Sequence, residues 1–297
     1  MDQDAAVPLP ISRSEALARR VPPHAFFLAS ALFHYLGPSF AVLLFDRLAP
    51  LGVAWLRIAT AAACYALWRR PWRYFAALPA SERRVVAALV AALGAVLALM
   101  NCCFYLAIAR LPLGTVSAIE FVGPIGLAAA GMRTKRNFAA LFLAAAGAFV
   151  LTDVRIAGAA LLYALAFANC ALFTLYIVLG HRIAARGGGI DRLGAAMLIA
   201  TLVATPIGIA DAAPAFTDPR LLAAGFGVGI TSSVIPYVCD QLAMARLGRA
   251  HFALLLSLLP ATAALVGFVV LRQVPTAAEI AGIALVAAGV VLHREAA

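Results

Sequence analysis

The sequence predicts an all-α membrane protein with ten transmembrane helices in two inverted five-helix repeats. Three observations predict this fold: an apolar composition, a series of long apolar segments, and an internal repeat. Of the 297 residues, 65% are apolar and 12% are charged, and the mean hydropathy is +0.99. Soluble domains are about 45–50% apolar and about 25% charged. So little polar surface cannot coat a water-soluble particle, and the composition therefore excludes a soluble enzyme and a disordered chain.

Long apolar segments follow one another along the chain, many of them close to the about 20 residues that cross a bilayer as a helix. Short polar connections separate them, so none holds a soluble catalytic domain. Residues 1–23 are expected to be a cytoplasmic N-terminal segment. The expected spans are residues 24–44, 51–68, 85–107, 113–131, 138–152, 157–179, 193–210, 220–240, 250–271 and 276–292.

The basic residues predict the orientation of these spans. The net charge is +10, but the 23 Lys and Arg residues fall in short segments between apolar runs and do not form one face. Nucleic acid is therefore not an expected partner. With a cytoplasmic N-terminus, 17 of these residues lie on the inside, 5 on the outside, and Arg57 within a span. Cytoplasmic loops carry the excess of Lys and Arg, so both termini are expected in the cytoplasm.

An internal repeat divides the chain into two halves. The six residues Leu106–Leu111 recur as Leu242–Leu247 with one difference, at an offset of 136 residues. The expected repeats are residues 24–152 and 157–293. A half with five spans is odd-numbered, so its duplicate must insert upside down. Inverted repeats are typical of secondary transporters, whose substrate site lies near the bilayer midplane between the halves.

Glu120 is the first candidate site residue, because it lies near the middle of the fourth span. A charge there costs about 2.5–3.5 kcal/mol even on insertion scales. Gly123 and Pro124 share its helix face and indicate a close approach or a helix break; Pro260 is the counterpart of Pro124 in the ninth span. The carboxylate either binds a substrate ammonium or a proton, or ties neighbouring helices together as a protonated group.

Arg57 is the second candidate, since it lies six residues into the second span and keeps its proton in proteins. Its guanidinium could bind a substrate carboxylate through two parallel hydrogen bonds. The alternatives are that it extends to the outer interface or pairs with Asp46.

Further polar residues occur at matched positions of the two halves. His34 in the first span aligns with Asn169 in the sixth, and a packing role is the alternative for His34. Asn101 and Tyr105 in the third span correspond to Tyr237 and Gln241 in the eighth, four residues apart in each case. These groups either line a substrate cavity or connect helices. Asp240 is expected at the cytoplasmic interface.

Several kinds of chemistry have no sequence support. The chain has no glycine-rich phosphate loop with a lysine, no clustered metal ligands and no nucleophile–base set, and its five cysteines lie in apolar stretches. No cofactor, metal or enzyme activity is expected. The expected partners are the lipid bilayer and a small-molecule substrate, with protons as the candidate coupling ion and a homodimer as the candidate oligomer.

Three stretches carry a family resemblance. Residues Arg110–Pro124, Trp55–Ala59 and Ile235–Tyr237 resemble EamA-type members of the drug/metabolite transporter superfamily. Among these they are most similar to the bacterial inner-membrane threonine and homoserine exporters. Two positions depart from the family pattern: Leu259 precedes the proline of the ninth span where relatives often have Glu, and Arg272-Gln273 replaces a usual Gly-Glu.

The resemblance implies an inner-membrane exporter of small polar metabolites, such as threonine or homoserine, that works by alternating access. Efflux of drugs or other amphipathic metabolites is the alternative within transport. An intramembrane enzyme and a membrane scaffold are the alternatives from other classes.

Overall fold

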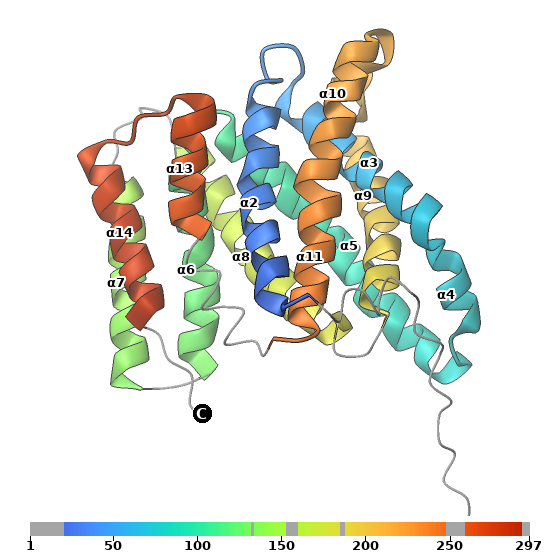
Figure 1. Cartoon of the computed structure of the whole chain (residues 1–297), viewed down its shortest axis with the longest axis horizontal. Coiled ribbons are helices and arrows are strands. Elements are labelled where there is room, and N and C mark those ends of the chain that lie inside the picture. The colour runs from blue at the N-terminus through green and yellow to red at the C-terminus, as the bar shows by residue number, and fades with distance from the viewer. Residues whose placement is uncertain (1–20, 132–133, 153–159, 185–187, 248–258, 293–297) are drawn as a thin grey trace, which may run out of the picture.

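The computed structural model describes residues 21–131, 134–152, 160–184, 188–247 and 259–292, which form a bundle of helices that run side by side (Figure 1). The described residues contain no strand. In the first half the helices are α2 (Pro23–Val42), α3 (Pro50–Arg69), α4 (Pro71–Ala77), α5 (Ala80–Ile108), α6 (Leu113–Gly131) and α7 (Lys135–Thr152). In the second half they are α8 (Ala160–Ala184), α9 (Gly189–Thr217), α10 (Pro219–Gly229), η1 (Ile230–Val234), α11 (Ile235–Met244), α13 (Leu259–Leu271) and α14 (Ala277–Leu292).

Six helical segments are long and apolar enough to cross a membrane within the described residues: α2, α3, α5, α8, α9 and the continuous run α10–η1–α11. Shorter apolar helices cover 113–126, 262–271 and 277–289. Large apolar side chains point outward from the bundle, such as Leu67, Phe142 and Phe149, which are 81%, 72% and 73% exposed. Such a surface suits a lipid environment, and the chain is a multi-pass membrane protein.

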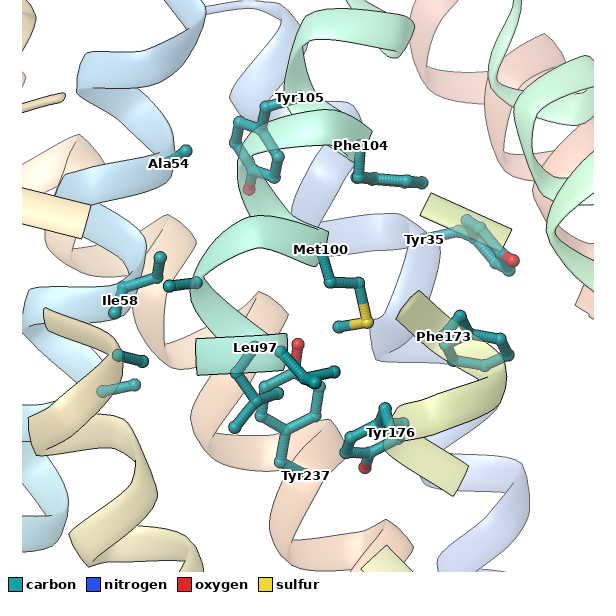
Figure 2. Packing of buried hydrophobic residues seen from close by; sticks show 14 of the residues in the cluster. Tyr35, Ala54, Ile58, Leu97, Met100, Phe104, Tyr105, Phe173, Tyr176 and Tyr237 are labelled. Carbon is teal, nitrogen blue, oxygen red and sulfur yellow. The ribbon is translucent and has the colours of Figure 1, made fainter. Parts of the chain in front are cut away.

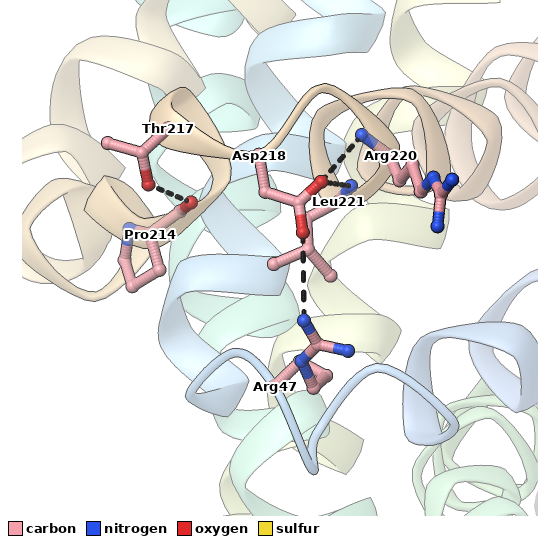
Figure 3. Close-up of polar contacts among 6 residues, drawn as sticks. All are labelled: Arg47, Pro214, Thr217, Asp218, Arg220 and Leu221. Carbon is pink, nitrogen blue, oxygen red and sulfur yellow. Dashed lines mark hydrogen bonds and ion pairs between the residues drawn. The ribbon is translucent and has the colours of Figure 1, made fainter.

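Prolines and one capping aspartate fix several helix ends. α2, α3, α4 and α10 each begin with proline, whose missing N–H costs nothing in the first helical turn. Asp218 caps α10, because its Oδ1 accepts from the backbone N–H groups of Arg220 and Leu221 at 2.9 and 3.4 Å. Its other oxygen pairs with Arg47 at 3.6 Å (Figure 3), which connects the α9–α10 turn to the loop after α2.

Within the described residues the structure has six membrane-long segments where ten spans were expected, and the helices also differ from the expected spans at their ends. α5, α8 and α9 extend beyond the predicted segments, and the short helix α4 was not predicted. α6 continues through Pro124, so this proline does not break the helix. The first part of the predicted ninth span lies outside the described residues.

Helices from the two halves alternate in the centre of the bundle. α2 packs against α11 and α13, while α8 packs against α5 and α6. Side chains from α2, α5, α6, α8 and α11 therefore meet in one interior. A second group, in which α7 packs closely on α14, lies to one side of it (Figure 1).

The two copies of the repeated six residues lie at opposite ends of the bundle. Just after the first copy, the Leu113 N–H donates to Gln273 Oε1 at 3.2 Å, beside the α13–α14 connection. In the second copy, Arg246 donates to the Val21 carbonyl at 2.7 Å, next to the start of α2. The α13–α14 connection and the start of α2 are at opposite ends in Figure 1.

Candidate functional site

A small polar cavity lies in the interior where the two halves meet. Its lining is shared between the first half and the second: His34, Arg57, Met100, Asn101, Phe104, Glu120, Asn169 and Tyr237. Its volume is about 10 Å³, which is about the space that one water molecule needs. An amino acid is much larger, so its entry requires helices to separate.

Glu120 is held in this cavity by neutral donors from two other helices. Its side chain lies on α6 and is only 2% exposed. The Tyr35 hydroxyl of α2 donates to Oε2 at 3.1 Å, and the Asn169 amide of α8 donates to Oε1 at 2.9 Å. Ser117 in turn donates to the Tyr35 hydroxyl at 2.7 Å, so donors in series point toward the carboxylate.

Arg57 reaches the same cavity from α3 and is 4% exposed. Its Nε donates to Ser233 Oγ at 2.7 Å, and its Nη2 donates to the Ser232 carbonyl at 2.6 Å. The guanidinium carbon also lies 5.4 and 5.8 Å from the ring centres of Tyr105 and Tyr237. These contacts stabilise the Arg57 cation without an acidic partner. Arg57 therefore neither extends to the outer interface nor pairs with Asp46, the two alternatives considered from the sequence.

The local sequence of the α10–α11 run explains why its backbone receives Arg57. Pro236 has no N–H, so it cannot donate to the Ser232 carbonyl four residues earlier. The run also contains the π-helical segment η1, an irregularity common at functional sites. Together they leave a carbonyl that a buried guanidinium can satisfy.

Asn101, Tyr237 and His34 complete the polar lining. The Asn101 amide donates to the Leu97 carbonyl at 2.7 Å and to the Tyr237 hydroxyl at 3.4 Å. The Tyr237 hydroxyl also accepts from Arg57 at 3.3 Å. The His34 ring lies edge-on to Phe173, with centres 5.9 Å apart.

Two predicted site residues do not line the cavity. Tyr105 lies beside it, where its ring supports Arg57. Gln241 lies one turn beyond Tyr237 and faces the first residue of α9: its Oε1 would be 2.8 Å from a Cβ added at Gly189. In each half, one residue of the matched pair lines the cavity, namely Asn101 or Tyr237. The other residue lies beside the cavity, as Tyr105 does, or away from it, as Gln241 does.

Sequence reasoning missed the supporting and apolar parts of the site. Met100 and Phe104 extend from α5 toward the aromatic side chains of α2 and α8 (Figure 2). Phe104 lies four residues after Met100 and three after Asn101, and these helical spacings could have indicated this face. Tyr35 and Ser117 carry no such signal, since hydroxyl residues are common in membrane helices. Asp240 was expected as a solvated residue close to the cytoplasmic interface, and the solvated part is wrong, because this side chain is 4% exposed.

Gly123 allows α6 to approach α8 closely. A Cβ at this position would lie 2.1 Å from Thr174 Oγ1 and 2.9 Å from Cys170 Sγ. Pro124 and Pro260 are also buried, the latter at the start of α13.

Gly123→Ala should therefore lower stability by about 1–3 kcal/mol, the usual cost of overpacking. Thermal unfolding in detergent measures this effect. Thr174→Ala removes the nearest atom, so the double variant should recover part of the loss. A wild-type unfolding temperature for Gly123→Ala would show that α6 and α8 are not packed this closely.

The fold and the cavity together define a class of protein: a polytopic helical membrane protein with a polar site between its two halves, as in secondary transporters. The profile of the EamA-like transporter family matches residues 160–294. The chain is 32% identical over 251 residues to the threonine/homoserine exporter RhtA of Salmonella typhimurium strain LT2, covering 82% of this chain and 81% of that protein. With RhtA of Escherichia coli K12 the identity is 32% over 247 residues. The chain belongs to the EamA-like transporter family.

A solved crystal structure has the same fold. It superposes with a TM-score of 0.58 over 91% of this chain and 96% of the other, at 16% sequence identity. This likeness concerns the fold alone.

Proposed function

We propose that this protein exports small polar metabolites, in particular amino acids such as threonine and homoserine, across the bacterial inner membrane by alternating access. The observation that carries the proposal is that Glu120 and Arg57 line one cavity. The two ion pairs found between described residues join Arg47 to Asp218 and Arg69 to Asp191, so these two buried groups do not pair with each other. A zwitterion placed between them would give each group an opposite charge.

The neighbouring groups fit the rest of an amino acid. The Asn169 amide oxygen accepts no hydrogen bond within the described chain, and it lies on the side chain that holds Glu120. A substrate ammonium could therefore donate to both Glu120 and Asn169. The substrate carboxylate would accept two parallel hydrogen bonds from the Arg57 guanidinium. His34 lines the same cavity, and its ring nitrogens could bind the hydroxyl of threonine or homoserine.

The closed cavity supports alternating access. A site with room for one water must open before an amino acid enters, and it must open on the other side for release. The lining comes from both halves, so a movement of one half against the other would open it. Ten crossings in two inverted halves fit this mechanism, and the repeated six residues at opposite ends of the bundle support the inversion.

The proposed orientation has both termini in the cytoplasm and the α9–α10 turn in the periplasm. Alkaline phosphatase fused after Thr217 should then be active, and the same enzyme fused after Ala77 should be inactive. The reason is that this enzyme folds only where its disulfides form. The reverse pattern of activities would contradict the orientation.

Reconstituted flux tests the function. Purified protein in liposomes loaded with unlabelled threonine should accumulate labelled threonine by counterflow, whereas liposomes without the protein should not. A panel of amino acids then defines selectivity. Met100 and Phe104 in the lining favour efflux of amphipathic compounds as the second candidate. Transport of an amphipathic cation without counterflow of any amino acid would favour that candidate and reject the first.

A further inference from the structure

A second buried carboxylate, Asp240, lies outside the cavity lining. It is on α11, four residues before the helix ends at Met244, and is 4% exposed. Ser30 of α2 donates to its Oδ1 at 2.5 Å, and the Tyr176 hydroxyl of α8 donates to its Oδ2 at 3.0 Å. Both donors are neutral, and Asp240 takes part in neither of the ion pairs found between described residues.

Such a site suits a proton better than any other cation. A buried carboxylate without a positive partner is costly in its charged form, and adding a proton removes that cost. No group of three or more His, Cys, Asp or Glu that could hold a metal occurs in the described part of the chain. Among the described residues, the titratable groups with which Asp240 interacts electrostatically are the phenols of Tyr65, Tyr176 and Tyr237 and the thiol of Cys239, which are ordinarily neutral near pH 7.

Ser30 can form a hydrogen bond with Asp240 whether the carboxyl group is charged or protonated. Its Oγ lies 2.5 Å from Asp240 Oδ1 and 3.3 Å from the Pro236 carbonyl oxygen. A hydroxyl has one hydrogen and two lone pairs. When Asp240 is charged, Ser30 donates to it. When Oδ1 carries a proton, this proton is donated to Ser30 Oγ, and Ser30 donates to Pro236 instead. No heavy atom has to move between the two arrangements.

Helices α2 and α8 each supply one donor to Glu120 and one to Asp240, at different depths in the bundle. α2 supplies Tyr35 to Glu120 and Ser30 to Asp240, five residues apart, which is about 7.5 Å along the helix. α8 supplies Asn169 and Tyr176, seven residues apart, or about 10 Å. Asp240 is thus nearer the end of the bundle where α2 begins and where α8 and α11 end.

Aromatic rings connect Asp240 to the cavity. The Tyr176 ring lies 5.6 Å from that of Tyr237 (Figure 2), whose hydroxyl accepts from Arg57 in the cavity. Asp240 therefore lies just beyond the cavity wall, on the side that the proposed orientation assigns to the cytoplasm.

We infer that Asp240 is a proton-binding site between the cavity and the cytoplasmic end, separate from the substrate site. The inference rests on the proposed function. In each cycle Asp240 forms an O–H bond with a proton that comes from the cavity side. It then returns this proton to water when the cytoplasmic end opens, while the substrate leaves in the opposite direction.

Asp240→Asn tests the inference, because it keeps the shape of the side chain and removes the proton site. Threonine counterflow, which needs no net proton movement, should stay within about threefold of wild type, while accumulation driven by a proton gradient should fall by about 20-fold or more. Proton flux evoked by threonine, followed with a pH-sensitive dye in the liposome lumen, should disappear. Asp46→Asn, which changes an exposed aspartate, is the matched control and should leave all three readouts unchanged.

The other outcomes have distinct meanings. Gradient-driven accumulation at the wild-type level in Asp240→Asn overturns the inference, and so does the loss of counterflow in a folded variant. Wild-type counterflow without threonine-evoked proton flux overturns it too but leaves the proposed function intact. Absence of wild-type counterflow rejects the function itself. If Asp240→Asn does not fold, Ser30→Ala serves instead: driven accumulation should fall by about threefold with counterflow kept, and unchanged accumulation overturns the inference.

Discussion

Glu120→Gln should abolish threonine transport while the protein still folds. Glutamine keeps the volume of the side chain, and its amide oxygen can still accept a hydrogen bond from Tyr35 or Asn169. It cannot carry a charge or a proton. Loss of one partner of a buried charge pair costs about 2–5 kcal/mol, so counterflow should fall by about 100-fold or more. Counterflow in liposomes and thermal unfolding in detergent measure the two expected results.

Glu82→Gln is the matched control, because Glu82 is exposed in the first turn of α5. It should transport and unfold like wild type. A Glu120→Gln protein that transports threonine normally would reject the role of the carboxylate. A variant that fails to insert or fold would support the structural alternative, in which Glu120 ties α6 to α2 and α8.

Arg57 variants should show the second large effect. Arg57→Lys keeps the positive charge but loses the planar pair of donors, so the affinity for threonine should fall by about tenfold. Arg57→Gln also removes the charge and should lower affinity by about 100-fold. Concentration dependence of counterflow measures both. Arg47→Lys is the control, since that side chain is 66% exposed in a surface ion pair of small energetic value.

An Arg57→Gln variant with wild-type affinity would show that Arg57 does not bind the substrate carboxylate. It would then remain a structural residue that connects α3 to the backbone of η1. Reduced stability with unchanged affinity would lead to the same conclusion.

Much of the cavity could be predicted from the sequence, because charge and amide groups are rare in membrane spans. His34, Arg57, Asn101, Glu120, Asn169 and Tyr237 were expected in a site and do line one cavity. Glu120 and Arg57 are the strongest cases, since burying an ionised group is so costly that it indicates a function or a specific partner. Helical spacing then placed Gly123 and Pro124 on the same face as Glu120.

Other features depend on how distant helices meet, and no local pattern reports that. Asp240 is close to the end of its apolar segment, which favoured a solvated position. It is buried because α2 and α8 cover it with Ser30 and Tyr176. Gln241 follows it by one residue, or about 100° around a helix of 3.6 residues per turn, and therefore faces elsewhere, toward Gly189 at the start of α9. The partners of Arg57 could not be predicted either, since they are a backbone carbonyl and a serine about 175 residues away.

Competition by charge-deleted analogues tests the placement of a zwitterion between Glu120 and Arg57 most directly. Threoninol lacks the carboxylate, and 2,3-dihydroxybutyrate lacks the ammonium group. Each should compete with labelled threonine for wild-type counterflow about 100-fold more weakly than threonine itself, because each leaves one buried charge unpaired. Competition by either analogue as strong as that by threonine would contradict the proposed pairing of that end of the substrate.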